Sequence, residues 1–76
     1  MTLAEMEVAS QCRILSAATE NSELRSRLYA LGMYPGVSVK ILRFAPTGDP
    51  MQVRIGGTLL SIRRQEAALV SVEALS

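Results

Sequence analysis

The fold of this chain is decided by Arg27–Pro50, which reads RLYALGMYPGVSVKILRFAPTGDP. The stretch holds the end of a helix, a turn, an apolar strand and a second turn, with almost no residues between them. Gly32 stands where the helix is expected to stop, because glycine adopts the left-handed conformation at little steric cost. Pro35–Gly36 then carries the signature of a type II turn. We therefore expect the chain to turn twice before it enters a strand.

A short helix is expected in front of Gly32. Asn21 or Ser22 can cap its first turn. Leucines recur at i, i+4 and i+7 and give one apolar stripe, made of Leu24, Leu28 and Leu31. Glu23 and Arg27 are spaced as an i, i+4 pair and are expected on the solvent side.

A strand over Val37–Phe44 is expected after the double turn, because apolar and polar residues alternate at its start. Leu42 and Phe44 fall on the polar side, where we expect the preceding helix to cover them. Ala45–Gly48 has proline second and glycine fourth, as a type I turn favours. Asp49 is expected to form an Asx-type turn in front of the next proline.

A two-residue hairpin turn is predicted at Gly56–Gly57, between two β-rich runs. Such a turn fixes the register, and cross-strand partners share a face of the sheet. One face then carries Met51, Val53, Ile55, Thr58, Leu60 and Ile62. The other face carries Gln52, Arg54, Leu59, Ser61 and Arg63, so a one-residue slip would bury the polar set.

Shorter elements are expected towards both ends of the chain. A helical turn is predicted within Met1–Glu7, and a strand over Gln11–Ala17. Leu15 breaks the alternation of that strand, which indicates either a bulge or partial cover of both faces. Arg64–Ala68 suits a single 3₁₀ turn, and Leu69–Glu73 a closing strand.

The order of these elements predicts an all-β chain with one short helix. Five short strands avoid exposed edges best by closing into a small barrel. A long first loop that holds the helix, a short second loop, a tight hairpin and a 3₁₀ turn are the order of an SH3-like barrel. We expect one domain over residues 1–76, with residues 1–9 as a variable N-terminal segment.

The composition argues against most kinds of chemistry. The 76 residues include no histidine and one cysteine, Cys12, so Ser–His and Cys–His catalysis and a thiolate–imidazole metal site have no basis within one chain. We expect no enzyme activity, no cofactor, no tight ferrous site in the monomer and a core position for Cys12. The net charge is +1, which does not predict nucleic-acid binding. No stretch has the length of a membrane span or the pattern of a signal peptide.

A protein-interaction module remains as the function that the residues favour. The exposed apolar side chains expected around the double turn would form a docking surface. We expect it to contain Leu31, Met33, Tyr34 and Pro35, with Leu59 across the hairpin. Self-association through Leu3 and Met6 is an alternative use of the N-terminal segment.

Three motifs resemble one known family. LYALGMYPG at residues 28–36, APTGDP at 45–50 and LSIRRQEA at 60–67 occur in the order and spacing of the bacterial ferrous iron transport protein A (FeoA) family. The resemblance covers roughly residues 10–75. It implies an SH3-like barrel with an inserted helix, the same fold that the order of the predicted elements indicates.

The resemblance also implies a role. It indicates a cytoplasmic accessory protein of bacterial ferrous iron uptake, which docks on the permease FeoB and modulates it. Its partner would recruit it to the inner face of the membrane. The alternatives are an SH3-like regulatory domain that acts on an iron-dependent repressor, and a small barrel that binds nucleic acid.

The remaining motif positions are interpreted as structural. An ion pair of Arg63 with Glu66 is expected across the 3₁₀ turn, an exposed contact that would contribute about 0–1 kcal/mol. The positions assigned to backbone geometry or local structure are Gly32, Gly36, Pro46, Gly48, Asp49, Pro50, Gly56, Gly57, Arg63 and Glu66.

Overall fold

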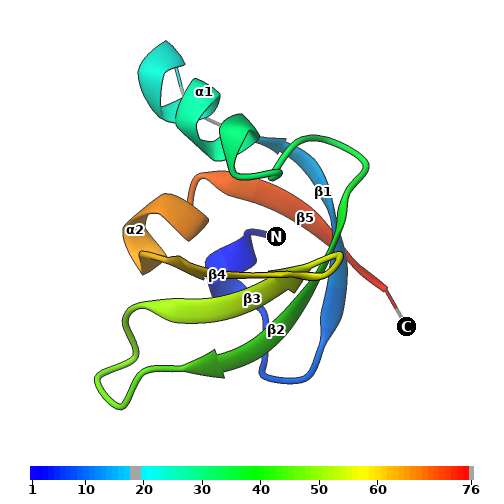
Figure 1. Cartoon of the computed structure of the whole chain (residues 1–76), viewed down its shortest axis with the longest axis vertical. Coiled ribbons are helices and arrows are strands. Elements are labelled where there is room, and N and C mark those ends of the chain that lie inside the picture. Colours follow the sequence, from blue (N-terminus) through cyan, green and yellow to red (C-terminus); the bar gives the residue numbers. More distant parts are fainter. Residues whose placement is uncertain (18–19, 76) are drawn as a thin grey trace.

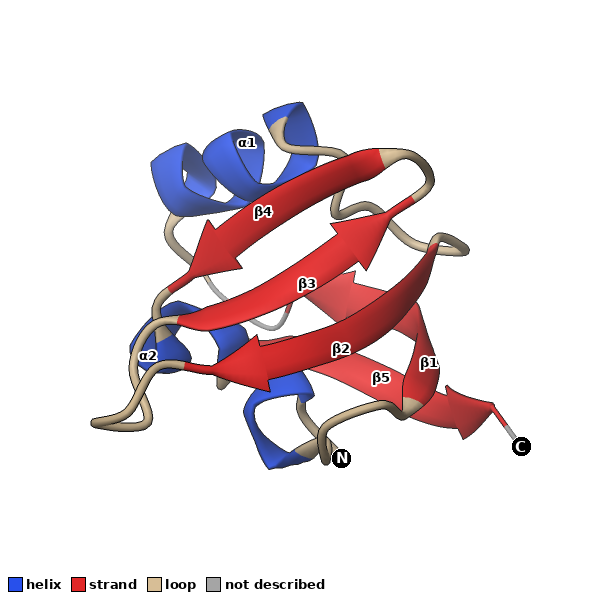
Figure 2. Ribbon diagram, turned by 60° about the horizontal axis from the view of Figure 1, so that its bottom comes forward, coloured by secondary structure: helices blue, strands red, loops and turns tan. Residues whose placement is uncertain are grey.

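The computed structural model of the chain describes residues 1–17 and 20–75 and is mostly β (Figure 1). Its elements in order are η1 (Leu3–Glu5), β1 (Gln11–Ala17), α1 (Ser22–Ala30), β2 (Ser38–Phe44), β3 (Met51–Ile55), β4 (Thr58–Ile62), α2 (Arg64–Ala67) and β5 (Val70–Leu75). The strands form one five-stranded antiparallel sheet in the order β4-β3-β2-β1-β5. The sheet curls, so that β1 and β5 lie behind β2, β3 and β4 (Figure 2). The predicted β fold with a helix between the first two strands is confirmed.

The hairpin register is the one predicted. Met51 pairs with Ile62, Val53 with Leu60, and Ile55 with Thr58. The register of β1 against β5 shifts between Ile14 and Ser16, which confirms a bulge at Leu15. A second shift, between Ile41 and Arg43 on β2, was not predicted. It explains why the alternation of β2 fails at Leu42, the residue between them.

An aliphatic core fills the space inside the curled sheet. Its buried residues are Leu3, Met6, Cys12, Ile14, Ala17, Leu28, Met33, Val39, Ile41, Met51, Val53, Ile62, Ala67, Val70 and Val72. Every helix and strand contributes to this set, so the core joins all parts of the fold. Within the described residues no polar or charged residue is fully buried.

The N-terminal segment is part of this core. The helical turn predicted there is η1, and both Leu3 and Met6 are buried. The carbonyl oxygen of Met1 accepts a hydrogen bond from the Val72 N–H at 2.9 Å, and Thr2 forms a bridge with Ser71. The expectation of self-association through Leu3 and Met6 is therefore wrong, because the chain's own core occupies these side chains.

The inserted helix α1 begins and ends as its sequence predicts. The Asn21 side chain accepts a hydrogen bond from the Leu24 N–H at 3.0 Å. At the other end Gly32 has φ +94°, and the Met33 N–H donates to the Leu28 carbonyl oxygen at 3.0 Å. This bond and the conformation of Gly32 are those of a Schellman motif at the end of a helix. In this motif the residue that donates the bond commonly makes a hydrophobic contact with the residue that accepts it. That geometry draws Met33 into the core beside Leu28, and both side chains are fully buried.

Asp49 joins the loop before β3 to the start of α2. Its Oδ1 accepts a hydrogen bond from the Arg64 N–H at 3.0 Å, across fifteen residues of sequence. Its Oδ2 lies 3.9 Å from Nη1 of Arg63. The expected Asx turn is therefore replaced by a long-range cap, and the expected 3₁₀ turn is α-helical, since the N–H groups of Ala67 and Ala68 bond four residues back.

Arg64 adds a second link at the same place. Its guanidinium lies over the Phe44 ring, 5.3 Å from the ring centre, and its Nη2 donates to the Ala4 carbonyl oxygen at 3.4 Å. Phe44 is thus half-buried under an arginine from α2, where cover from the inserted helix was expected. The position of Arg64 ties the N-terminal turn, β2 and α2 together.

Replacing Asp49 by alanine is expected to lower the free energy of unfolding by about 1–2 kcal/mol, because the Arg64 N–H loses its acceptor. Urea denaturation of Asp49→Ala should show a lower midpoint at an unchanged slope. Asp49→Asn keeps an acceptor oxygen, so its free energy of unfolding is expected to fall less than that of Asp49→Ala. Equal stability of the alanine variant and the wild type would contradict this role.

Cys12 gives a second test of the packing. The side chain is fully buried, and burial raises the pKa of its thiol, so the reactive thiolate is scarce near neutral pH. We expect a thiol reagent such as 5,5′-dithiobis(2-nitrobenzoate) to label the native protein at pH 8 far more slowly than the urea-unfolded protein. Equal rates in the two states would show that the core is open at β1.

Candidate docking surface

The double turn after α1 is fastened to β1 by two backbone hydrogen bonds. The Gly36 N–H donates to the Ile14 carbonyl oxygen at 2.8 Å, and the Ile14 N–H donates to the Val37 carbonyl oxygen at 2.9 Å. Gly36 has φ +93°, a conformation that a side chain would strain. With the Schellman motif at its other end, the connection between α1 and β2 is fixed at both ends.

Apolar side chains point outward from this fixed connection. Leu31 at the end of α1 is 41% exposed, Tyr34 is 51% exposed, and Pro35 is also exposed. A rigid backbone that displays apolar side chains loses little conformational entropy when a partner binds. We refer to Leu31, Tyr34 and Pro35, together with Leu15, as the turn surface.

Leu15 was not identified as a surface residue from the sequence. The bulge in β1 turns its side chain outward, 49% exposed, and it directly follows Ile14, the residue that anchors the turn. The broken alternation of Gln11–Ala17 was the available signal. It indicated the bulge, but the pairing of Ile14 with Val37 and Gly36 was needed to place Leu15 near the turn.

Two of the predicted docking residues do not belong to this surface. Met33 is fully buried, so its expected exposure is wrong; it supports the turn from the core side. Leu59 is 69% exposed but stands on the outer face of β4. A Cβ built on Gly32 would lie 3.9 Å from Cγ2 of Ile55, a residue of the opposite, inner face. The connection therefore approaches the hairpin on the side away from Leu59.

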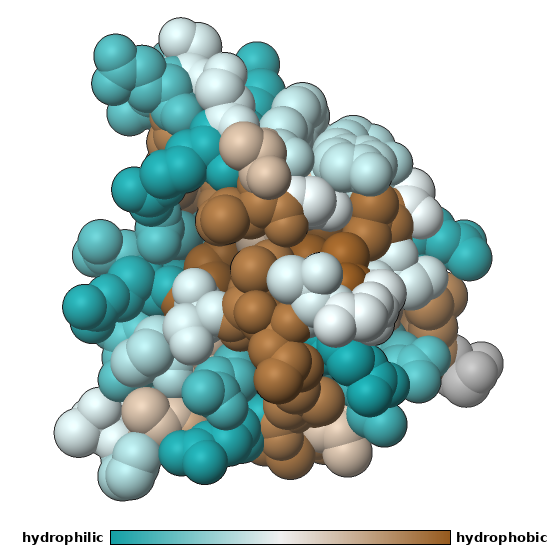
Figure 3. Space-filling view, viewed as in Figure 1, coloured by the Kyte–Doolittle hydropathy of each residue, from teal (hydrophilic) through white to brown (hydrophobic). Residues whose placement is uncertain are grey.

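Apolar surface gathers on one face of the molecule (Figure 3). In the view of Figure 1, it forms a band that extends downward from beneath α1, with hydrophilic residues on both sides (Figure 3). Bands of this kind with polar borders mark contact surfaces.

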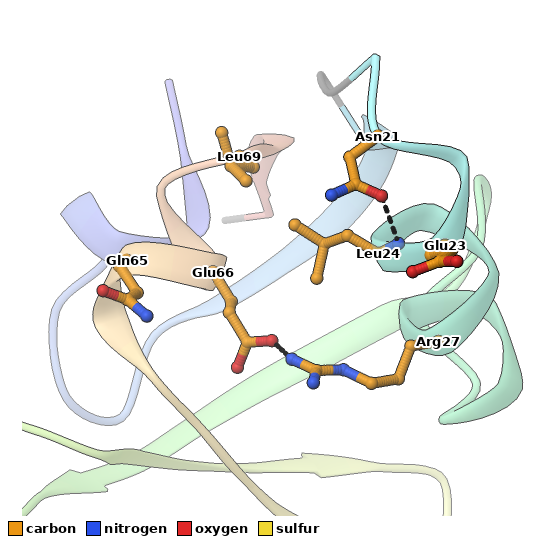
Figure 4. Close-up of a pocket in the computed structure, with 7 residues that line it drawn as sticks. All are labelled: Asn21, Glu23, Leu24, Arg27, Gln65, Glu66 and Leu69. Atoms are coloured by element: carbon orange, nitrogen blue, oxygen red, sulfur yellow. Dashed lines mark hydrogen bonds and ion pairs between the residues drawn. The ribbon is translucent and has the colours of Figure 1, made fainter.

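A groove between α1 and α2 has a volume of about 550 Å³. It is lined by Asn21, Glu23, Leu24, Arg27, Gln65, Glu66 and Leu69, and Arg27 and Glu66 point toward one another across it (Figure 4). The ion pair of these two residues replaces both expected pairs, Arg63 with Glu66 and Glu23 with Arg27. The Glu66 side chain is only 15% exposed, since α2 turns it under the end of α1.

Arg27 and Glu66 form an ion pair in this groove, and Glu23 adds a second carboxylate to its lining. The lining includes no thiol, hydroxyl or imidazole that could act as a nucleophile or a base. Among residues 1–17 and 20–75, no three acidic or cysteine side chains come together as metal ligands would. No helix in this part of the chain has the length and apolar character needed to cross a membrane. The geometry offers surfaces for contact.

Comparison with known proteins identifies relatives of this fold. The FeoA from Chlorobium tepidum is 41% identical and superposes with a TM-score of 0.90 over 100% of this chain and 71% of its own. The FeoA from Stenotrophomonas maltophilia, solved with zinc and described as an SH3 domain protein, is 30% identical with a TM-score of 0.83, over 96% of this chain and 89% of its own. The predicted SH3-like class is thereby confirmed.

A relative in Porphyromonas gingivalis joins two proteins in one chain. It is an Fe²⁺ transport protein A/Fe²⁺ transporter FeoB fusion, 29% identical over all 76 residues of this chain, which spans 9% of the fusion. The profile of the FeoA domain matches residues 1–74. From this match and the shared fold, the chain belongs to the FeoA family of ferrous iron transport.

Proposed function

We propose that this protein docks on the cytosolic part of a FeoB-type permease and modulates it through protein–protein contacts. The observation that carries the proposal is the turn surface, where a connection fixed at both ends holds Leu31 and Tyr34 outward. The fusion in Porphyromonas gingivalis supports the choice of partner, because a relative of this domain is there covalently tied to the transporter.

The residues of the turn surface suit an interface core. Tyrosine contributes a large apolar area with a polar end and is enriched among residues that dominate binding. Leu15 and Leu31 add aliphatic area to this surface, and each side chain is roughly half exposed in the free protein. The backbone need not reorganise, so binding costs less conformational entropy.

Iron enters this mechanism as the cargo of the permease. The protein acts by occupying a surface of its partner, at the inner face of the membrane where the cytosolic part of the permease lies. No residue of this chain needs to bind the ion, which agrees with the lack of histidine and the burial of Cys12.

The double variant Leu31→Ser/Tyr34→Ala is expected to bind the purified permease roughly 30-fold more weakly than the wild type. Loss of a central aromatic and its neighbour typically costs about 2 kcal/mol or more of binding free energy. Both side chains are exposed, so the fold should persist, which circular dichroism can verify. Binding is measured by pull-down and by biolayer interferometry on immobilised permease.

Val8→Ser serves as the matched control, because Val8 is 52% exposed yet lies in the turn between η1 and β1. It should bind as the wild type does. A folded double variant that retains wild-type affinity would refute docking through this surface.

A further inference from the structure

The strands β2, β3 and β4 carry basic residues on their outer face and contain no acidic residue. The three strands read SVKILRF, MQVRI and TLLSI. Lys40, Arg43 and Arg54 point outward from them, and Arg63 follows β4 on the same face. The acidic residues lie outside these three strands, at Glu5, Glu7, Glu20, Glu23, Asp49, Glu66 and Glu73, and Asp49 lies 3.9 Å from Arg63.

Strand register places two of these cations directly opposite one another. Lys40 on β2 is the cross-strand partner of Arg54 on β3, an arrangement of like charges that disfavours the sheet. Of the ion pairs formed by the described residues, none includes Lys40, Arg43 or Arg54. These cations are therefore available to an anion from outside the chain.

A small hollow lies at this pair, with a volume of about 160 Å³. The residues that line it include Gln11, Ser38, Lys40 and Arg54. All four side chains can donate hydrogen bonds to an oxyanion. Two cations with two neutral donors match one phosphate group.

An apolar side chain completes the row. Along one line across the sheet, Gln11 pairs with Lys40, Lys40 with Arg54, and Arg54 with Leu59. Leu59 is 69% exposed, the most exposed large apolar side chain described, and its neighbour on this line is a cation. Cations with an exposed leucine beside them suit the boundary between lipid headgroups and acyl chains.

We propose that this outer face binds the anionic surface of a membrane. Lys40 and Arg54 hold a lipid phosphate between them, Arg43 adds attraction, and Leu59 inserts at the headgroup level. The strands lie side by side as one open face (Figure 2). No tyrosine or phenylalanine faces outward on the row to stack a base, which favours lipid over single-stranded nucleic acid. This contact requires no permease and goes beyond the proposed docking.

Vesicle co-sedimentation of the full chain tests the proposal. The wild type should sediment with phosphatidylcholine vesicles that contain 30 mol% phosphatidylglycerol, and remain in solution with phosphatidylcholine alone. Because a juxtamembrane cation contributes about fivefold to binding, Arg54→Gln should bind roughly fivefold more weakly, and Lys40→Gln/Arg54→Gln roughly 30-fold. Raising NaCl from about 0.1 to about 1 M shortens the screening length from about 10 to about 3 Å and should release the protein.

Arg25→Gln is the matched control, since it removes one positive charge from the exposed side of α1 and should change binding less than twofold. Leu59→Ser should weaken vesicle binding and leave its salt dependence intact. The double variant should also be at least as stable to urea as the wild type, because it removes the repulsion of Lys40 and Arg54. If Lys40 and Arg54 served only to stabilise the fold, the double variant would be less stable to urea than the wild type.

Three outcomes would overturn the proposal: sedimentation that is equal with neutral and anionic vesicles, wild-type binding by the double variant, or no binding to anionic vesicles. Preference for a short RNA over the vesicles, measured by fluorescence anisotropy, would assign the face to nucleic acid instead. The vesicles contain no permease, so none of these results bears on binding to the permease through the turn surface.

Discussion

The two hydrogen bonds of Ile14 are the constraint on which the rest of the fold depends. This one residue of β1 gives both its N–H and its carbonyl oxygen to the connection at Gly36 and Val37. The bonds close the loop that contains α1, set the point where β2 begins, and lie beside the bulge that turns Leu15 outward. Without these bonds the connection would be a flexible loop, and its apolar side chains would not be held in fixed positions.

The hydrogen bond between Asp49 and Arg64 explains why two distant motifs occur together. APTGDP supplies Asp49, and LSIRRQEA supplies the Arg64 N–H that it caps. The same motif supplies Glu66, whose ion pair with Arg27 reaches the helix in front of the LYALGMYPG turn. The three motifs are therefore parts of one contact network. Asp49 and Glu66 mainly position α2, which closes the core through Ala67.

Local rules predicted most of the fold, and long-range contacts account for the errors. A two-residue turn and alternating strands determined the hairpin register, and Gly32 determined the end of α1. The partners of Asp49 and Glu66 depend on how separate elements pack, which no spacing in the sequence reveals. Met33 was misplaced because its apolar character was visible while the direction of its side chain was not. The balanced net charge likewise concealed the cations that register gathers on the face of β2, β3 and β4.

The most direct test of the docking surface is a map of it on the labelled protein. The cytosolic part of the permease is added to ¹⁵N-labelled protein, and amide shifts are followed by NMR. We expect the largest shift changes at Leu15 and from Leu31 to Gly36, while the amide signals of Lys40 and Arg54 stay in place. Changes confined to the groove between α1 and α2 or to the outer sheet face, with none at the turn, would contradict it.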